Sequence, residues 1–387
     1  MNVLKHLAMT IALATFLPLS AGSKTFEEPY KSPEEQHKPL IIWQWMDGLV
    51  TKDGITRDLE AFKEAGLAGV QNFQIGGPDQ MRIGNPDNAI GNENWKELLR
   101  WTLDECERLG LTFGTHNCPG WSSSAYPTVK PEYSMQKLVF TETPYKKGQR
   151  KITLPTPEVD QQWNYYEDVA VLAIPSDSVA TLSQIINLTE SFDTAKGELN
   201  LKKIKIPDNY TLLRIGQTTN GKTNKAQSPE TGRGLECDKL SKEAVKAFWD
   251  GYPSMLVETA GNHVGKTFTH IEIDSYEAGG QTWSPVLPDE FKKRKGYEII
   301  PYLPYMIGRL KEIDGNENTS RFLKDWESVV TDCVAENYYG YMTSLANEAG
   351  LKMMIEPYGT GGKKPFRIID FEKIVLASDG ADIATEF

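Results

Sequence analysis

The sequence has few cysteines and histidines, which argues against several common classes of protein. Among its 387 residues are four cysteines and five histidines. Cys106, Cys118, Cys237 and Cys333 are scattered without a CxxC pair, so neither a disulfide scaffold nor a cysteine-based metal site is expected. We expect buried thiols, with a single disulfide as the alternative. The sequence contains no HExxH or HxH motif, which argues against a zinc hydrolase.

Other signatures and an excess of positive charge are also missing. The sequence has no GxSxG elbow, no Rossmann glycine fingerprint and no P-loop, so serine hydrolases and nucleotide-binding folds lack support. Lys and Arg number 42 against 53 Asp and Glu, a net charge of −11. Because nucleic acids and anionic membrane surfaces bind basic faces, we expect neither as a partner.

Only one long apolar run is present, and it lies at the N-terminus. Lys5 precedes an apolar stretch from 7 to 19, and small residues follow at 20–23. The stretch is too short for a transmembrane helix and is typical of a secretory signal. We therefore expect a cleaved signal peptide over 1–23, a polar linker over 24–38 and a bacterial periplasmic or secreted protein without a membrane anchor.

An alternation of strands and helices follows the linker. Strand-like runs cover 40–46, 69–75 and 112–118, and helical patterns cover 51–65 and 93–109. Thr51 is a plausible N-cap and Gly110 a plausible stop. Strand, helix and strand in this order predict parallel βα units. We assign residues 39–134 to the first part of an α/β fold, a (β/α)8 TIM-like barrel.

The alternation is interrupted and then resumes. Residues 135–232 contain short apolar runs between polar turns, which predict an antiparallel β insertion after the third strand. The barrel continues over 233–387 with four further strand candidates: 234–238, 268–274, 352–356 and 383–386. Seven strands are thus expected, without the last βα unit. A doubly wound sheet has the same rhythm, but functional-looking residues follow many different strands here, which favours a barrel.

Acidic residues lie at the ends of the last four strand candidates: Glu236, Asp238, Glu272, Asp274, Glu277, Glu356 and Glu386. Because side chains alternate along a strand, Ile271 and Ile273 share one face and the two neighbouring acids share the other. Converging carboxylates serve general acid and base catalysis, as in glycoside hydrolysis, or bind a hard cation such as Ca²⁺. Each acid taken singly could instead be a surface charge or a helix cap.

Aromatic residues lie at or just beyond the same strand ends: Trp45, Trp121, Trp283 and Tyr358. Such rings could stack on the apolar face of a sugar, although packing in the core or a loop is the alternative for each. His116 ends the third strand and could form a hydrogen bond with a substrate hydroxyl. His270 has no comparable placement.

Several segments together resemble glycoside hydrolase family 106, the secreted bacterial α-L-rhamnosidases. The ordered set spans roughly residues 40–387 and consists of these pieces: WMDG (45–48), TKDGIT (51–56), GLAGV (66–70), NCPGW (117–121), LRIG (213–216), TTNG (218–221), GLECDKL (234–240), DSYE (274–277), EPYG (356–359) and EF (386–387). Proteins of this family are usually far longer, with β domains after the barrel. We therefore interpret the chain as C-terminally truncated.

The resemblance implies a calcium-assisted, inverting exo-α-L-rhamnosidase that acts on a rhamnose-containing plant polysaccharide or glycoconjugate. It implies Glu386 as general base, with Glu277 before Glu272 or Asp274 as general acid. Asp274 and Glu356 are the proposed Ca²⁺ ligands. The candidates for substrate binding are Trp45, His116, Trp121, Glu236, Asp238, Trp283 and Tyr358. An inactive or carbohydrate-binding remnant, or a retaining barrel glycosidase for another sugar, is the alternative.

Overall fold

The computed structural model describes residues 31–77, 84–224, 229–276, 278–357 and 370–383. The chain divides into two units, 1–38 and 39–387. In the first unit, the described part contains a short 3₁₀ turn, η1 (Glu35–His37), and an ion pair between Lys38 and Glu35. The predicted signal peptide lies outside the described residues.

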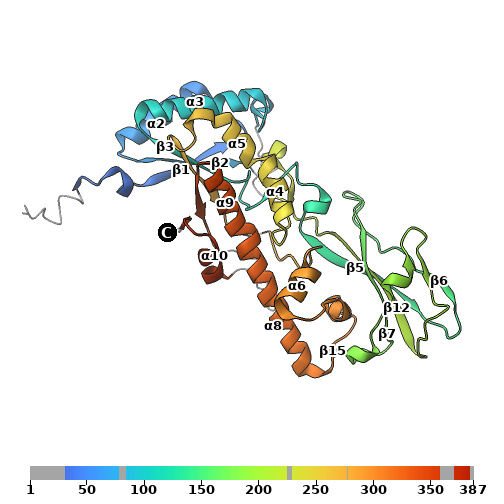
Figure 1. Ribbon diagram of the computed structural model, residues 1–387. Helices are drawn as coiled ribbons and strands as arrows, with labels where there is room; N and C mark the ends of the chain where they lie inside the picture. The colour runs from blue at the N-terminus through green and yellow to red at the C-terminus, as the bar shows by residue number, and fades with distance from the viewer. Residues whose placement is uncertain (1–30, 78–83, 225–228, 277, 358–369, 384–387) are drawn as a thin grey trace, which may run out of the picture. The chain divides into compact units, whose positions relative to one another are not determined.

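A parallel sheet organises the second unit (Figure 1). Its six strands follow chain order: β1 (Leu40–Met46), β2 (Gly69–Ile75), β3 (Thr112–His116), β14 (Phe268–Ile273), β16 (Lys352–Ile355) and β17 (Asp382–Ile383). The order never reverses, so this sheet has no switch point of the doubly wound kind. Within the described residues β1 and β17 are unpaired edges, and the sheet is open rather than closed into the expected barrel.

The prediction that residues 234–238 form a strand of this sheet is wrong. The segment contributes β13 (Leu235–Glu236), which pairs antiparallel with β4 (Ala125–Tyr126) in a separate two-stranded sheet. Gly234 allows this pairing, because a Cβ at its position would lie 2.0 Å from the carbonyl oxygen of Tyr126. A short apolar run carries no information about which neighbour it will pair with.

The first two helices begin and end where the sequence indicates. In α2 (Lys52–Glu64), the Thr51 hydroxyl accepts a hydrogen bond from the amide of Gly54 at 3.1 Å. In α3 (Glu93–Leu109), Gly110 ends the helix in the left-handed conformation, with φ of 63°. The indole of Trp43 on β1 donates to Asp58 of α2 at 3.0 Å. This face of β1 therefore packs on a helix.

The remaining helices follow the insertion: α4 (Lys242–Gly251), α5 (Pro253–Ala260), α6 (Leu287–Lys295), α7 (Leu303–Met306), α8 (Gly315–Cys333), η10 (Val334–Gly340), α9 (Tyr341–Glu348) and α10 (Phe371–Ala377). The segments α8, η10 and α9 form one continuous helix, visible in Figure 1, whose middle part is π-helical. In the part of the chain that the structure describes, no helix is both long and apolar enough to span a bilayer.

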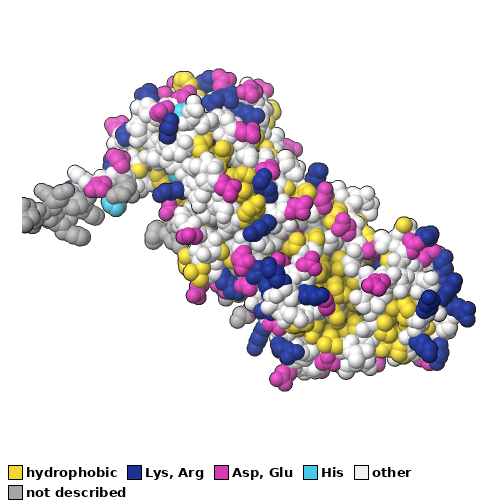
Figure 2. All heavy atoms as spheres, in the orientation of Figure 1, with side chains coloured by type: hydrophobic (Ala, Val, Ile, Leu, Met, Phe, Trp, Pro, Cys, Tyr) yellow, Lys and Arg dark blue, Asp and Glu magenta, His cyan; other side chains and the backbone are white. Residues whose placement is uncertain are grey.

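Antiparallel strands fill much of the stretch from 136 to 219. One sheet has the order β5 (Gln136–Pro144), β12 (Tyr210–Thr219), β7 (Glu167–Pro175), β9 (Ile186–Asn187), and another has β10 (Phe192–Asp193), β11 (Glu198–Asn200), β6 (Lys151–Thr153). A short pair joins β8 (Val179–Ala180) to β15 (Glu312–Ile313). The central strand β12 is buried throughout. Figure 2 shows acidic and basic side chains interspersed over the face in view, with apolar groups gathered near β5.

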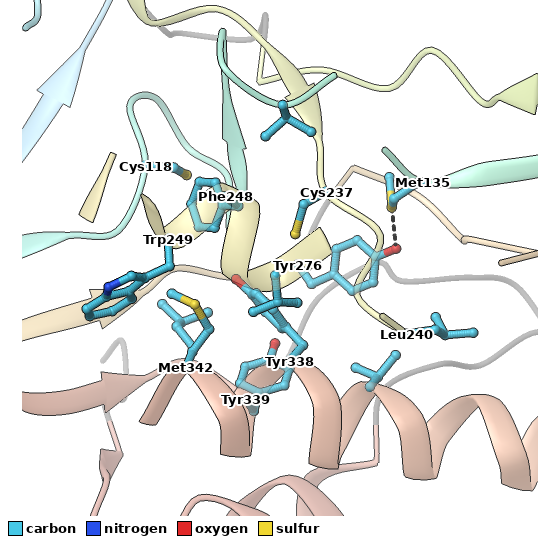
Figure 3. Close-up of a cluster of buried hydrophobic side chains, with 14 of the residues drawn as sticks. Cys118, Met135, Cys237, Leu240, Phe248, Trp249, Tyr276, Tyr338, Tyr339 and Met342 are labelled. Atoms are coloured by element: carbon cyan, nitrogen blue, oxygen red, sulfur yellow. Dashed lines mark hydrogen bonds between the residues drawn. The ribbon is translucent and has the colours of Figure 1, made fainter. Parts of the chain in front are cut away.

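The core beside the parallel sheet contains many aromatic and sulfur-bearing side chains. All four cysteines are buried and unpaired. Burial raises the pKa of Cys106, Cys237 and Cys333 to about 12, so these thiols stay protonated. Figure 3 shows Cys118 and Cys237 in the region where Tyr276, Tyr338 and Tyr339 converge.

Candidate active site

Three of the predicted acids lie together at the carboxyl ends of β14 and β16. Glu272 is opposite His116 of β3 in the strand register, and the amide of Glu356 donates to the carbonyl of Ile273 at 2.9 Å. Glu272, Asp274 and Glu356 are each 4–5% exposed. Parallel neighbouring strands thus bring Glu356 to the same edge of the sheet as Glu272 and Asp274, which precede it by about 80 positions in the sequence.

Asp274 and Glu356 form a close pair. The amide of Ser275 donates to Asp274 Oδ1 at 2.7 Å and to Glu356 Oε2 at 3.1 Å. Asp274 Oδ2 is buried and has no hydrogen-bond partner among the residues that the structure describes. Burial, with added repulsion from Glu356 and Glu272, raises the pKa of Asp274 to about 8. At neutral pH the pair therefore favours a bound proton or a cation over two free charges.

A chain of buried hydrogen bonds orients the side chain of Glu272. Gln71 of β2 donates to Glu272 Oε2 at 2.5 Å, and His270 Nε2 lies 2.6 Å from Gln71 Oε1. Because the amide oxygen only accepts, His270 donates from Nε2, and its Nδ1 accepts from Thr269 at 2.9 Å. Burial lowers the pKa of His270 to about 4, which keeps the ring neutral. Gly114 lies between the two side chains and leaves room for their contact.

His116 presents a hydrogen-bond donor at the same strand ends. Its Nε2 accepts from the amide of Gln74 at 3.0 Å, so the neutral ring carries its proton on Nδ1. Nδ1 is buried without a partner among the described residues, and burial lowers the pKa of His116 to about 3. The ring lies 4.6 Å from that of Phe73, which in turn lies 5.1 Å from half-buried Trp121.

The π-helical turn brings two consecutive tyrosines to this region. Tyr338 donates to the carbonyl of Ser123 and accepts from the Asn117 amide at 3.3 Å. The hydroxyl of Tyr339 is buried without a partner in the described chain, as is Asn117 Oδ1. Burial raises the pKa of Tyr339, and the charges of Glu356 and Asp274 raise it further. Unpartnered buried polar atoms are rare in folded proteins, so this group marks a place for ordered water or a ligand.

Two predicted substrate-binding acids are instead occupied by neighbouring side chains. Glu236 is fully buried, and it accepts from Ser122, from Ser124 at 2.6 Å and from Lys239 at 2.8 Å. Both of its oxygens are therefore taken. Asp238 accepts from Gln281, from Ser284 at 2.5 Å and from the amide of Leu240 at 2.9 Å. Burial raises the pKa of Asp238 to about 6.

Two predicted aromatic contacts are enclosed by the fold. Trp45 is 1% exposed, and it shares the helix-facing side of β1 with Trp43, whose ring lies 5.6 Å away. Trp283 is also 1% exposed, and its indole donates to Gln217 of β12 at 2.8 Å. Neither ring joins the group formed by His116 and Trp121. Three other predicted residues, Glu277, Tyr358 and Glu386, lie outside the described residues.

Several residues of the site were missed from the sequence. His270 could have been found, because it precedes Glu272 by two positions and therefore shares its face of the strand. Gln71 and Tyr339 gave no local signal.

A pocket of about 320 Å³ also lies beside the end of β1, with polar lining from Asp47, Asn85, Asn88, Glu230 and Thr231.

Carboxylates at the ends of neighbouring parallel strands are an arrangement that glycoside hydrolases use. A model of the alpha-L-rhamnosidase family, glycoside hydrolase family 106, matches residues 31–161 and 158–373. The chain therefore belongs to this family, as its sequence motifs indicate.

Two relatives show what the chain is similar to. A Formosa agariphila protein with the provisional name beta-glucuronidase is 34% identical over 368 residues, covering 86% of this chain and 30% of that protein. The solved structure of a rhamnosidase from Novosphingobium sp. PP1Y matches with a TM-score of 0.77 at 22% identity, covering 91% of this chain and 49% of that one. The chain thus spans half or less of the length of these relatives, and the structural match shows a shared fold.

Proposed function

We propose that the chain is the catalytic region of a secreted, inverting exo-α-L-rhamnosidase that uses Ca²⁺ and acts on rhamnose-containing plant glycans. The observation that carries this proposal is the close Asp274–Glu356 pair at adjacent strand ends, in a chain of the rhamnosidase family. The strand order without reversal supports a (β/α)8 barrel as the complete architecture. The apolar run near Lys5 supports export.

The donor chemistry of the Asp274–Glu356 pair fits calcium. Ca²⁺ takes about six to eight oxygen ligands, and the pair offers only oxygens, one of them buried and unpartnered. No group of three His, Cys, Asp or Glu side chains suited to a metal occurs in the described part of the chain, so main-chain carbonyls, water, sugar hydroxyls or acids outside that part would complete the shell. When bound, the cation would offset the negative charge and bind sugar hydroxyls.

The close approach of Asp274 and Glu356 argues against their being the acid and base of inversion. Inverting enzymes separate these two carboxyl groups by about 6.5–9.5 Å to leave room for water. A single amide, that of Ser275, bonds both members of this pair. We keep Glu386 as the proposed general base and Glu277 as the proposed acid, with Glu272 as the alternative, as the resemblance to the family implies.

The residues around the carboxylates have distinct parts in the proposed reaction. A protonated carboxyl group gives its proton to the leaving glycosidic oxygen, while an ionised one takes a proton from the attacking water. Half-buried Trp121 would cover an apolar sugar face, and the buried Nδ1–H of His116 would donate to a substrate hydroxyl or to an ordered water bound to that hydroxyl. Gln71 keeps Glu272 oriented through its 2.5 Å hydrogen bond.

The name of the Formosa relative makes a β-glucuronide the competing substrate. A glucuronate carries a carboxylate, which a Ca²⁺ ion held by Asp274 and Glu356 would attract, so charge does not separate it from a neutral rhamnosyl group. The family match is what favours a rhamnoside. A carbohydrate-binding role without turnover, or a retaining enzyme for another sugar, would use the same strand-end residues, and the assay distinguishes these alternatives from the proposal.

The decisive experiment compares an aryl α-L-rhamnoside with an aryl β-D-glucuronide, each with Ca²⁺ and with a chelator. We expect rhamnose release that falls on chelation, with no glucuronide turnover. Glu356→Gln is the test variant, and exposed Glu60→Gln is its matched control. An NMR time course of the released sugar reports inversion or retention. Glucuronide turnover, or binding of rhamnosides without release by folded protein, would refute the proposal.

A further inference from the structure

A fully buried lysine lies beside the candidate site. The side chain of Lys239 is 0% exposed, and its Nζ lies 2.8 Å from Glu236 Oε2 and 2.7 Å from the Ser124 hydroxyl. The same nitrogen lies 4.2 Å from the ring centroid of Tyr276 and 5.3 Å from that of Tyr338. A buried ammonium group is stable only when such partners replace water, so each contact fixes its partner in turn.

The partners of Lys239 belong to the segments that carry the site. Ser124 follows β3, Tyr276 follows β14, and Tyr338 lies in η10 beside Tyr339. The main chain of Lys239 also contacts the loop after β14, because its amide donates to Gln281 Oε1 at 3.2 Å. The turn at 236–239 therefore holds the loop after β14 at two places, near residue 276 and near residue 281.

Tyr276 connects this turn to the Asp274–Glu356 pair. Its ring faces Lys239, and its hydroxyl donates to Met135 Sδ at 3.0 Å, the contact drawn in Figure 3. Ser275, the preceding residue, is the one whose amide bonds both carboxylates. Movement of Tyr276 would therefore move that amide and change the separation of the two acids.

We propose that Lys239 is a positioning residue that fixes the Ser275 amide through Tyr276, and so sets the affinity of the Asp274–Glu356 pair for a divalent cation. The cation part rests on the proposed function, whereas the fixing of Ser275 does not. A purely structural ion pair would stabilise the fold without affecting Ser275 or the two carboxylates.

The test uses variants that separate positioning from stability. Lys239→Met alone leaves Glu236 as an unpaired buried charge, so the primary variant is Glu236→Gln/Lys239→Met, which removes both charges at nearly constant volume. Tyr276→Leu removes the ring and keeps the ion pair. Tyr276→Phe keeps the ring, and Lys242→Met removes a cation that lies 5.4 Å from the Tyr341 ring elsewhere; both are controls.

Two measurements on the full chain decide the outcome. Hydrogen–deuterium exchange of the peptide containing Ser275 should be about 10-fold or more faster in the double variant and in Tyr276→Leu, and unchanged in both controls. Calorimetric titration should show Ca²⁺ binding about 10–100-fold weaker in the same two variants. Unchanged exchange in folded variants would overturn the positioning role. Absence of Ca²⁺ binding by the wild-type chain, with the exchange result intact, would instead overturn the calcium part of the proposed function.

Discussion

Replacing Gly114 by alanine would insert a methyl group into the contact between His270 and Gln71. A Cβ at this position would lie 2.0 Å from His270 Nε2 and 2.4 Å from Gln71 Oε1. Neither side chain can keep its present position at such distances. The variant therefore removes the His270–Gln71 hydrogen bond and displaces the amide that orients Glu272.

The expected cost follows from these contacts. Each disrupted hydrogen bond leaves a buried polar group, at about 1–3 kcal/mol, and forced repacking adds about 1–3 kcal/mol. With both the His270–Gln71 and the Gln71–Glu272 hydrogen bonds disrupted, we expect Gly114→Ala to lower the free energy of unfolding by about 3–9 kcal/mol. Because a typical domain has only about 5–15 kcal/mol in total, the variant should be close to unfolding at 37 °C.

Urea denaturation measures this loss, and two comparisons identify its cause. Gly66→Ala meets nothing within 4 Å and has a φ of +83°, so it should cost only about 1–2 kcal/mol from backbone strain. Adding His270→Ala to Gly114→Ala removes the clashing ring and should recover part of the loss. The reasoning fails if Gly114→Ala costs no more than Gly66→Ala, or if the two changes at 114 and 270 are additive.

Four further predictions concern the site and its surroundings. Glu356→Gln should abolish the proposed Ca²⁺ dependence and lower the proposed rhamnosidase activity about 10–100-fold while leaving the melting temperature within a few degrees, as kinetics and calorimetry would show. The pKa of His270 is lowered to about 4, so its neutral ring contributes stability above pH 6.5 that is lost as the pH falls toward 4. In urea denaturation, the stability advantage of wild type over His270→Gln should therefore shrink by about 3 kcal/mol between pH 6.5 and pH 4. A difference that stays constant with pH would contradict this. The pKa of Asp274 is raised to about 8, so the folded chain holds a proton there at low pH and its stability falls as the pH rises toward 8. Because Ca²⁺ binds the ionised carboxylate, it should raise the melting temperature more at about pH 9 than at about pH 6. The reverse order would argue against this site. In Gly340→Ala a Cβ would lie 2.5 Å from the carbonyl oxygen of Ala377. Thermal denaturation should therefore show a free energy of unfolding lower by about 1–3 kcal/mol. An unchanged stability would mean that α10 does not pack against η10.

Local signals in the sequence predicted the βα units well. Thr51 and Gly110 mark helix ends by capping chemistry that depends only on nearby backbone, so the structure places them as expected. The alternation over residues 271–274 likewise depends on strand geometry alone. Glu272 consequently shares a face with His270, and Ile271 and Ile273 are fully buried on the other.

Features that depend on distant partners could not be read in the same way. Residues 234–238 look like a strand of the parallel sheet, yet their partner is β4, more than a hundred positions earlier. Lys239 gives no sign in the sequence that it is buried, because only Glu236 among its partners is local, whereas Ser124, Tyr276 and Tyr338 are distant. Burial of a charge is decided by the assembled fold rather than by the residue type.

Two neighbouring groups of buried acids are treated in opposite ways by this fold. Glu236 is compensated by Lys239 and two serine hydroxyls, so its charge is satisfied inside the chain. Asp274 is held beside Glu356 with one oxygen unpartnered in the described structure, although burial and repulsion both disfavour its charge. The first arrangement minimises the cost of burial, whereas the second maintains a cost that a bound proton, cation or substrate would relieve. This contrast between a compensated acid and an uncompensated pair is the reason we propose the Asp274–Glu356 pair as the centre of the candidate site.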